Sequence, residues 1–262
     1  MTAPHLYVLA GNRLIPQPAA VSPWAAKFQS GIPIAGLLAH VCENAQAAAS
    51  MMLARLSIDI LRPAPMEPTE ARCAVSHEDG GSQHLEASLW IGGVEVARAT
   101  ALRVGIDRMQ PAAAAQISYP PPDEAPDRPI NRRIDPGMET RVLYGGLTER
   151  GPGAAWVRPT VEIISGKSAS PVVGAAMGAD FGGALSSVHD GRIWSFANVD
   201  LCIHYFRQPV SDWIRVQSTM ITEGTGSALV DTRLADLEGD FGRAHQTLYI
   251  APQPSRADRM KS

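Results

Sequence analysis

The 262-residue sequence lacks the features that mark membrane proteins, secreted proteins and nucleic-acid-binding proteins. Its apolar runs stay well short of the roughly 20 residues that a bilayer-spanning helix needs. The N-terminus, MTAPHLYVLAGNR, has no basic stretch before its short apolar segment, as a signal peptide would. The net charge is only −3, so we expect no strongly basic face. These absences predict a protein with no membrane span and no nucleic-acid partner.

Cysteine is scarce as well. The chain contains only Cys42, Cys73 and Cys202, an odd number without the spacing of a metal site. Its seven histidines show no metal-ligand spacing either. We therefore expect reduced thiols and a cytoplasmic location, and we expect neither a metal nor a cofactor.

The composition that is present is that of a globular protein, with 45% apolar and 19% charged residues. The length suits one large domain or two small ones. The stretch 106–136 holds seven of the 21 prolines and divides the chain. Because proline fixes φ and removes a backbone donor, this stretch is typical of a linker. The division predicts an N-terminal domain at 1–105 and a C-terminal domain at 137–262.

The two parts share one order of expected elements, a helix followed by four β-strands. The alanine-rich stretch 33–50 predicts the first helix, and 171–186 predicts the second. Runs that favour β-strands follow each helix and are separated by glycine-containing turns. These runs are 53–62, 69–78, 83–91 and 94–104 in the first part, and 193–206, 213–222, 228–236 and 241–250 in the second.

Three short anchors recur in the same order in both parts and indicate an internal repeat. The first lies near the start of each helix, the second ends a strand at an arginine and a proline, and the third lies in the last strand. The matches are Pro33-x-x-Gly36 with Pro171-x-x-Gly174, Arg62-Pro63 with Arg207-Gln208-Pro209, and Arg98-Ala99-Thr100-Ala101 with Arg243-Ala244-His245-Gln246.

Four phrases of the sequence resemble the acyl-CoA thioesterase II (TesB-like) superfamily. They are LARLSIDILRPAP at 53–65, MGADFGG at 177–183, ANVDLCIHYFRQP at 197–209 and GRAHQTLYI at 242–250. The resemblance covers nearly the whole chain outside the proline-rich stretch and is strongest over 171–250. It implies an α+β double hotdog fold, in which each repeat is a long helix wrapped by an antiparallel β-sheet. It also implies a role in lipid metabolism, in which an acyl-CoA is hydrolysed to a free acid and CoA.

The resemblance places the catalytic residues in the second part. They are Asp180 in the helix, Asn198 nine residues before Arg207, and Gln246 in the last strand. Asn198 departs from the Thr or Ser that the family has at this position, but an amide also donates and accepts hydrogen bonds. The loop Gln29-Ser30-Gly31 departs too, since relatives commonly have His-Gly-Gly there. The repeat aligns the three catalytic positions with Cys42, Leu53 and Ala101, which fits one active site per chain.

The implied chemistry is attack by a water molecule, with Asp180 as the proton acceptor and Asn198 and Gln246 orienting the water or the carbonyl. Apolar neighbours in the helix predict a raised pKa for Asp180. Strand alternation alone does not decide where Asn198 points, because a β-bulge near 198 would reverse its side.

Several alternatives stay open at this stage. Taken singly, Asp180 is typical of a helix cap or a solvated side chain, and Gln246 and Asn198 are typical of ordinary strand or turn residues. The chain could be a non-catalytic acyl-thioester or acyl-chain binding protein, a hotdog hydratase or dehydratase, or a purely structural double hotdog. The expected partner is an acyl-CoA substrate, and association into a homodimer or a higher homo-oligomer is left open.

Overall fold

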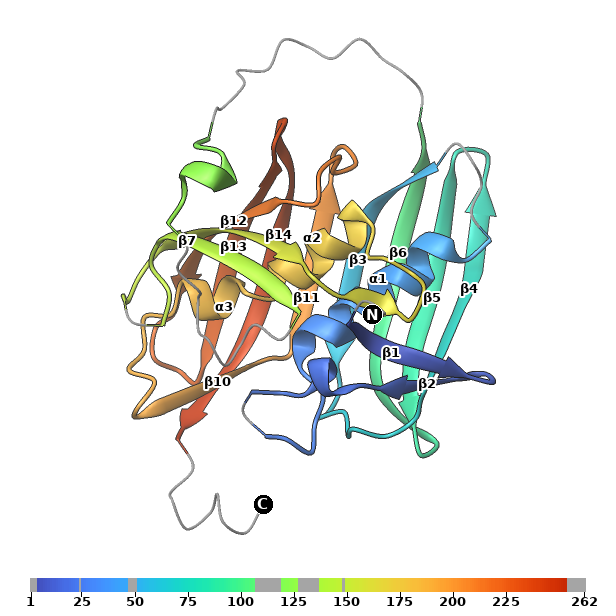
Figure 1. Cartoon of the computed structure of the whole chain (residues 1–262), viewed down its shortest axis with the longest axis horizontal. Helices are drawn as coiled ribbons and strands as arrows, with labels where there is room; N and C mark the ends of the chain where they lie inside the picture. Colours follow the sequence, from blue (N-terminus) through green and yellow to red (C-terminus); the bar gives the residue numbers. More distant parts are fainter. Residues whose placement is uncertain are drawn as a thin grey trace.

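The computed structural model describes residues 4–23, 25–46, 51–106, 119–126, 137–147 and 149–253. Its strands form one 14-stranded sheet that curves around two central helices, α1 (Gly31–Asn44) and α2 (Pro171–Ala179). Figure 1 shows the strands from the earlier part of the chain, in blue and green, on one side and those from the later part, in orange and red, on the other. No helix in these ranges is long and apolar enough to cross a membrane.

The strands that follow α1 agree with the predicted runs to within a few residues. They are β3 (Met51–Ile60), β4 (Thr69–Asp79), β5 (Ser82–Ile91) and β6 (Val94–Gly105). In β5, alternate residues such as Leu85, Ala87 and Leu89 are buried against α1, and the intervening residues are more exposed. This two-residue period is the pattern of a sheet with one face on the core.

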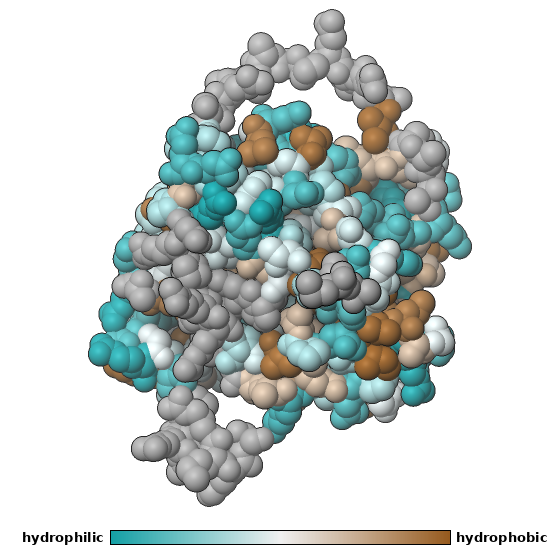
Figure 2. Space-filling view, in the orientation of Figure 1, coloured by the Kyte–Doolittle hydropathy of each residue, from teal (hydrophilic) through white to brown (hydrophobic). Residues whose placement is uncertain are grey.

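The later strands lie on the other side of the helices and follow a short helix, α3 (Gly182–Leu185). They are β10 (Trp194–Asn198), β11 (Asp200–Tyr205), β12 (Ile214–Ile221), β13 (Ser227–Asp236) and β14 (Gly239–Pro252). In the orientation of Figure 1, hydrophilic residues cover much of the described surface and hydrophobic residues form separate small groups (Figure 2).

Five strands and two short 3-10 helices were not among the predicted elements. They are β1 (His5–Ala10), β2 (Arg13–Pro16), β7 (Met138–Tyr144), β8 (Gly153–Pro159), β9 (Glu162–Ile164), η1 (Pro18–Ala20) and η2 (Pro122–Glu124). The first five residues of β8 are all buried, so it lacks the alternation that marks a strand in a sequence. The strands β2 and β9 are too short to show a period.

The two groups of strands meet where β3 pairs with β11. The pairing is antiparallel and sets Leu56 opposite Ile203 and Ile58 opposite Leu201. All four side chains are buried. The strands that meet here are the two that carry the arginine–proline anchor of the repeat. The complete strand order is β7-β8-β12-β13-β14-β11-β3-β6-β5-β4-β2-β1-β9, with β10 paired to β14.

The predicted helix 171–186 is wrong in one respect, since it is interrupted after Ala179. The chain continues through Asp180 and Phe181 into the four residues of α3. The backbone carbonyl of Asp180 accepts hydrogen bonds from the side-chain amides of Asn198 and Gln246, each at 3.3 Å. These two hydrogen bonds come from residues distant in sequence, and they hold the carbonyl at the point where α2 ends and the chain turns into α3. The other helix begins at Gly31 rather than 33 and ends at Asn44, and residues 47–50 lie outside the described ranges.

The predicted strand 193–206 is two strands, separated at Val199. Both pair with β14, but Asn198 lies opposite Leu248 whereas Cys202 lies opposite His245, so the segment 198–202 holds one residue more than the β14 segment that it faces. This is the β-bulge considered above. It lets Asn198 point inward to Asp180 although Leu201, three residues on, also points inward and is buried.

Most of the proline-rich stretch, residues 107–118 and 127–136, lies outside the described ranges. The described part, 119–126, packs on the later strands. The Tyr119 hydroxyl donates to Asp240 at 2.8 Å, and the Trp156 indole donates to the carbonyl of Pro120 at 2.9 Å. The role of the whole stretch as a linker stays a prediction.

The close packing of α1 on α2 gives a first testable prediction. A Cβ atom at Gly36 would lie 2.7 Å from Cγ of Met177 and 3.1 Å from Cδ1 of Ile163. We expect Gly36→Val to lower the free energy of unfolding by about 2–3 kcal/mol in urea titrations, because the helices must move apart. The control Gly81→Val, in a turn with nothing within 4 Å of the new Cβ, should stay within about 1 kcal/mol of wild type. Equal stability of the two variants would contradict close packing at Gly36.

Candidate functional site

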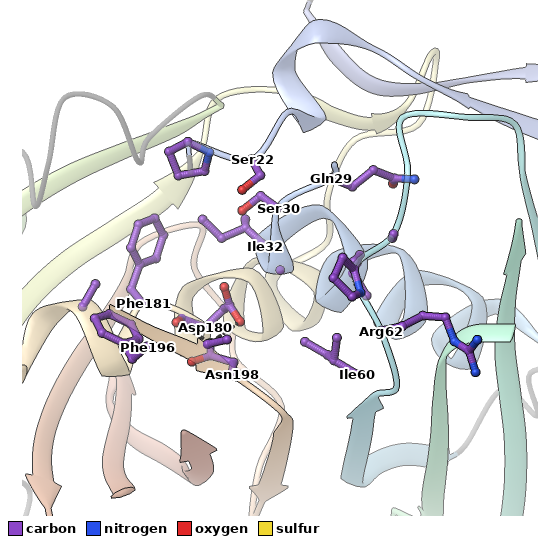
Figure 3. A pocket seen from close by; sticks show the side chains of 17 residues that line it. Ser22, Gln29, Ser30, Ile32, Ile60, Arg62, Asp180, Phe181, Phe196 and Asn198 are labelled. Atoms are coloured by element: carbon purple, nitrogen blue, oxygen red, sulfur yellow. Dashed lines mark hydrogen bonds between the residues drawn. The ribbon is translucent and has the colours of Figure 1, made fainter. Parts of the chain in front are cut away.

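A cavity of about 180 Å³ lies between segments from the two parts of the chain. Residues 22–34 and 60–64 contribute one wall, and residues 180–184 and 196–198 contribute the other. Figure 3 shows Asp180 and Asn198 facing this space from below the start of α1. Two of the three predicted catalytic residues therefore line a cavity.

The Asp180 carboxyl group lies against the first residue of α1. Asp180 ends α2, and a Cβ atom at Gly31 would lie only 2.8 Å and 2.9 Å from its two carboxyl oxygens. Glycine is therefore the residue that admits the carboxyl at this position. Ser30, which precedes the helix, makes no side-chain capping bond to it. The carboxyl is thus the acidic group at the positive end of the α1 dipole.

The surroundings of Asp180 change its acidity. Burial raises the pKa of the carboxyl from its usual 3.8 to about 6, and the hydrogen bond from Asn198 partly opposes this rise. A carboxyl with this pKa is mostly ionised at pH 7 and is still a better proton acceptor than an ordinary aspartate. Such a shift is characteristic of functional carboxylates.

Asn198 is the side-chain partner of this carboxyl. It is the last residue of β10, and its Nδ2 donates to Oδ1 of Asp180 at 2.7 Å and to the Asp180 carbonyl at 3.3 Å. The bulge at Val199 turns it toward the cavity. Its own Oδ1 is buried and has no hydrogen-bond partner within the described ranges.

Gln246 occupies a different position from the other two residues. It lies on β14 with 0% of its surface exposed, and it contacts the Asp180 backbone carbonyl rather than the carboxyl. It is not among the residues that line the cavity. A Cβ atom at Gly182 would clash with its Oε1, so that oxygen is held behind the turn that joins α2 to α3. Gln246 therefore supports the backbone of Asp180 from behind.

Most of the residues that shape this cavity were not predicted from the sequence. Gly31 was identified only as part of a loop that departs from the family, Phe181 only as an apolar neighbour of Asp180 in the helix, and Phe196 was not identified at all. The arginine–proline anchors of the repeat did contain a signal for one cavity residue, Arg62. Arg207 is paired with buried Asp236 at 2.6 Å, whereas its counterpart Arg62 is exposed at the edge of the cavity. The described residues contain no group of three His, Cys, Asp or Glu side chains that could hold a metal.

Comparison with solved structures places this fold among hotdog proteins. A conserved protein of unknown function with a hot dog fold from Alicyclobacillus acidocaldarius is 14% identical, with a TM-score of 0.73 over 95% of this chain and 96% of that one. An acyl-CoA thioesterase II from Mycobacterium marinum is 17% identical, with a TM-score of 0.65 over 86% and 91%. The tesB protein of Mycobacterium avium subspecies paratuberculosis is 16% identical, with a TM-score of 0.65 over 94% and 96%.

The sequence itself defines the family. The family model of the acyl-CoA thioesterase C-terminal domain matches residues 111–250, and that of the N-terminal domain matches residues 20–104. The chain belongs to the acyl-CoA thioesterase family, as its resemblance to the TesB-like proteins predicted. No curated protein matches the sequence.

The raised pKa of Asp180 makes a prediction about stability. The pKa of this carboxyl is about 6 in the folded protein, whereas its ordinary value, which applies to the unfolded chain, is 3.8. The carboxyl therefore ionises less readily in the folded protein, so its ionisation lowers the free energy of unfolding. This loss grows from about pH 4 to about pH 6 and is constant above. We expect Asp180→Asn to raise the free energy of unfolding by about 1–2 kcal/mol at pH 8, after allowance for partial exposure.

Chemical denaturation at pH 8 and pH 5 measures this effect, and the gain should be smaller at pH 5. The matched control is Asp59→Asn, because Asp59 is an exposed aspartate on β3. A variant at Asp180 that is less stable than wild type at pH 8 would contradict the raised pKa.

Proposed function

We propose that this protein is an acyl-CoA thioesterase that hydrolyses an acyl-CoA to a free acid and CoA, with Asp180, Asn198 and Gln246 as its functional residues. The observation that carries the proposal is the position of the Asp180 carboxyl, which faces a cavity beside the first turn of α1. Membership of the acyl-CoA thioesterase family supports the same activity. A cytoplasmic location, a role in lipid metabolism and homo-oligomer formation remain expectations.

We further propose that the fold is an α+β double hotdog, with repeats at 1–105 and 137–262 joined by a linker at 106–136. The antiparallel contact between β3 and β11 supports this division, because these two strands carry equivalent anchors of the repeat. The packing of α1 against α2 supports it as well. In this arrangement the cavity lies between the two repeats.

The proposed reaction needs only water and the residues of this chain. The oxygen of a water molecule bonds to the thioester carbonyl carbon while Asp180 accepts one of its protons. The C–S bond then breaks, the acid is released, and the proton passes from Asp180 to the departing thiolate. The positive end of the α1 dipole lies next to Asp180 and stabilises the negative charge that develops on the carbonyl oxygen.

The two amides have separate roles in this proposal. Asn198 holds one carboxyl oxygen of Asp180 at 2.7 Å and so orients the proton acceptor toward the water. Gln246 is a positioning residue, because it bonds to the Asp180 carbonyl and fixes the backbone where α2 ends. Hydration or dehydration of an acyl thioester usually needs a histidine beside the carboxylate. The described residues that line the cavity include no histidine, which favours hydrolysis over that alternative.

Removal of the carboxyl tests the reaction directly. We expect Asp180→Asn to lower kcat for release of CoA thiol by about 10²–10⁴-fold, which is the usual contribution of a general base. Asp59→Asn should leave kcat unchanged. Full turnover in a folded Asp180→Asn variant would refute the role of Asp180, and saturable acyl-CoA binding by wild type without thiol release would favour a binding protein.

The pH dependence tests the same residue in a second way. Because Asp180 must be ionised to accept a proton and its pKa is about 6, kcat/KM should rise between pH 5 and 7 and level off above. The hydrogen bond from Asn198 lowers the pKa, so Asn198→Leu should move the midpoint of the profile to higher pH. A profile that is flat from pH 5 to 8, or a midpoint that moves downward in the variant, would contradict this assignment.

A further inference from the structure

The cavity has one closed, apolar end and one open end. Phe181 and Ala184 are buried, and together with Phe196 they close the side next to α3. On the opposite side the cavity reaches the exposed residues Arg62 and Pro63. Figure 3 shows the two phenyl rings on one side of Asp180 and Arg62 on the other, with its side chain directed away from the cavity. A thioester at Asp180 would therefore place its acyl group toward the rings and its CoA toward solvent.

The volume of the cavity limits the size of that acyl group. The whole space is about 180 Å³. This volume is close to that of a cavity of about 150 Å³ that holds a benzene molecule. Resting on the proposed function, we infer that the substrate is an acyl-CoA with a short, uncharged acyl group of about six carbons or fewer.

The chemistry of the closed end excludes a charged acyl group. The side chains around it are apolar, with Ile32 and Ala184 completing the surface formed by the two rings. Asp180 is the nearest acidic group, and the arginine of the cavity lies at the open end. A second carboxylate on the acyl chain would lose its hydration without gaining a cation, and it would repel Asp180. Succinyl-CoA should therefore be a poor substrate, although it has the same number of carbons as butyryl-CoA.

Phe196 forms the part of the cavity wall whose truncation should lengthen the cavity. A Cβ atom at Gly183 would lie 3.3 Å from Cε2 of Phe196 and 3.2 Å from Cδ1 of Leu248. Phe196 also packs on an apolar cluster formed by Met220, Ala228, Val230, Leu248 and Ile250. Its replacement by alanine removes the ring that separates the cavity from this cluster. A longer acyl chain then has an apolar surface to contact.

Thiol-release kinetics with acetyl-, butyryl-, hexanoyl-, octanoyl-, palmitoyl- and succinyl-CoA test the inference. We expect the highest kcat/KM with the four- and six-carbon substrates, and values about 100-fold lower with palmitoyl- and succinyl-CoA. Phe196→Ala should raise the ratio of octanoyl to butyryl kcat/KM by about 10-fold. The control is Phe206→Ala, because Phe206 is 66% exposed and lies outside the cavity, and it should leave the ratio unchanged.

A second variant keeps the test valid if Phe196→Ala does not fold. Ala184→Leu fills the closed end, so it should reduce activity on hexanoyl-CoA far more than activity on acetyl-CoA. Palmitoyl-CoA hydrolysed as fast as hexanoyl-CoA, or succinyl-CoA as fast as butyryl-CoA, would overturn the inference while the proposed function stands. Absence of thiol release from all six substrates would instead overturn the proposed function.

Discussion

The contact between the Asp180 carboxyl and Gly31 is the constraint on which the site depends. It joins the end of α2 to the start of α1 and leaves no room for a Cβ atom at residue 31. Burial raises the pKa of this carboxyl. The hydrogen bond from Asn198 and the positive end of the α1 dipole both favour its ionised form. Burial and the Asn198 hydrogen bond together set a pKa of about 6, which is low enough for ionisation at pH 7 and high enough for proton transfer.

This contact also explains why the secondary structure is irregular near the site. The Asp180 carboxyl reaches Gly31 only if its backbone is held at the end of α2, and the amides of Asn198 and Gln246 bond to that backbone carbonyl. Asn198 in turn reaches Asp180 through the bulge at Val199. The break in the helix and the bulge in the strand thus both help to position the Asp180 carboxyl. Such irregularities cost stability, and they are expected to persist where function requires them.

The regular parts of the fold could be predicted from the sequence, and the irregular parts could not. Alternating apolar residues located the strands that follow each helix because each has one buried face, whereas β1, β2, β7, β8 and β9 were not predicted. The break after Ala179 depends on amides from residues 198 and 246, which are distant in sequence, so no local pattern announces it. The resemblance brought Asp180, Asn198 and Gln246 together as candidates. It did not indicate that Gln246 contacts a carbonyl behind the cavity, or that Gly31 adjoins the carboxyl, because both facts arise from packing between the two parts.

The two central helices begin differently, and this difference is consistent with one candidate site per chain. At α2 the Ser170 hydroxyl accepts a hydrogen bond from the Val173 N–H and donates to Glu43 at 2.7 Å. Its first turn is therefore capped by a side chain. At α1 Ser30 makes no such capping bond, and the dipole faces Asp180 and the cavity. The earlier part of the chain has buried apolar residues, Cys42, Leu53 and Ala101, at the positions aligned with the three candidate catalytic residues. It thus supplies an uncapped helix start and part of the cavity wall, whereas the later part supplies the carboxyl and the amides.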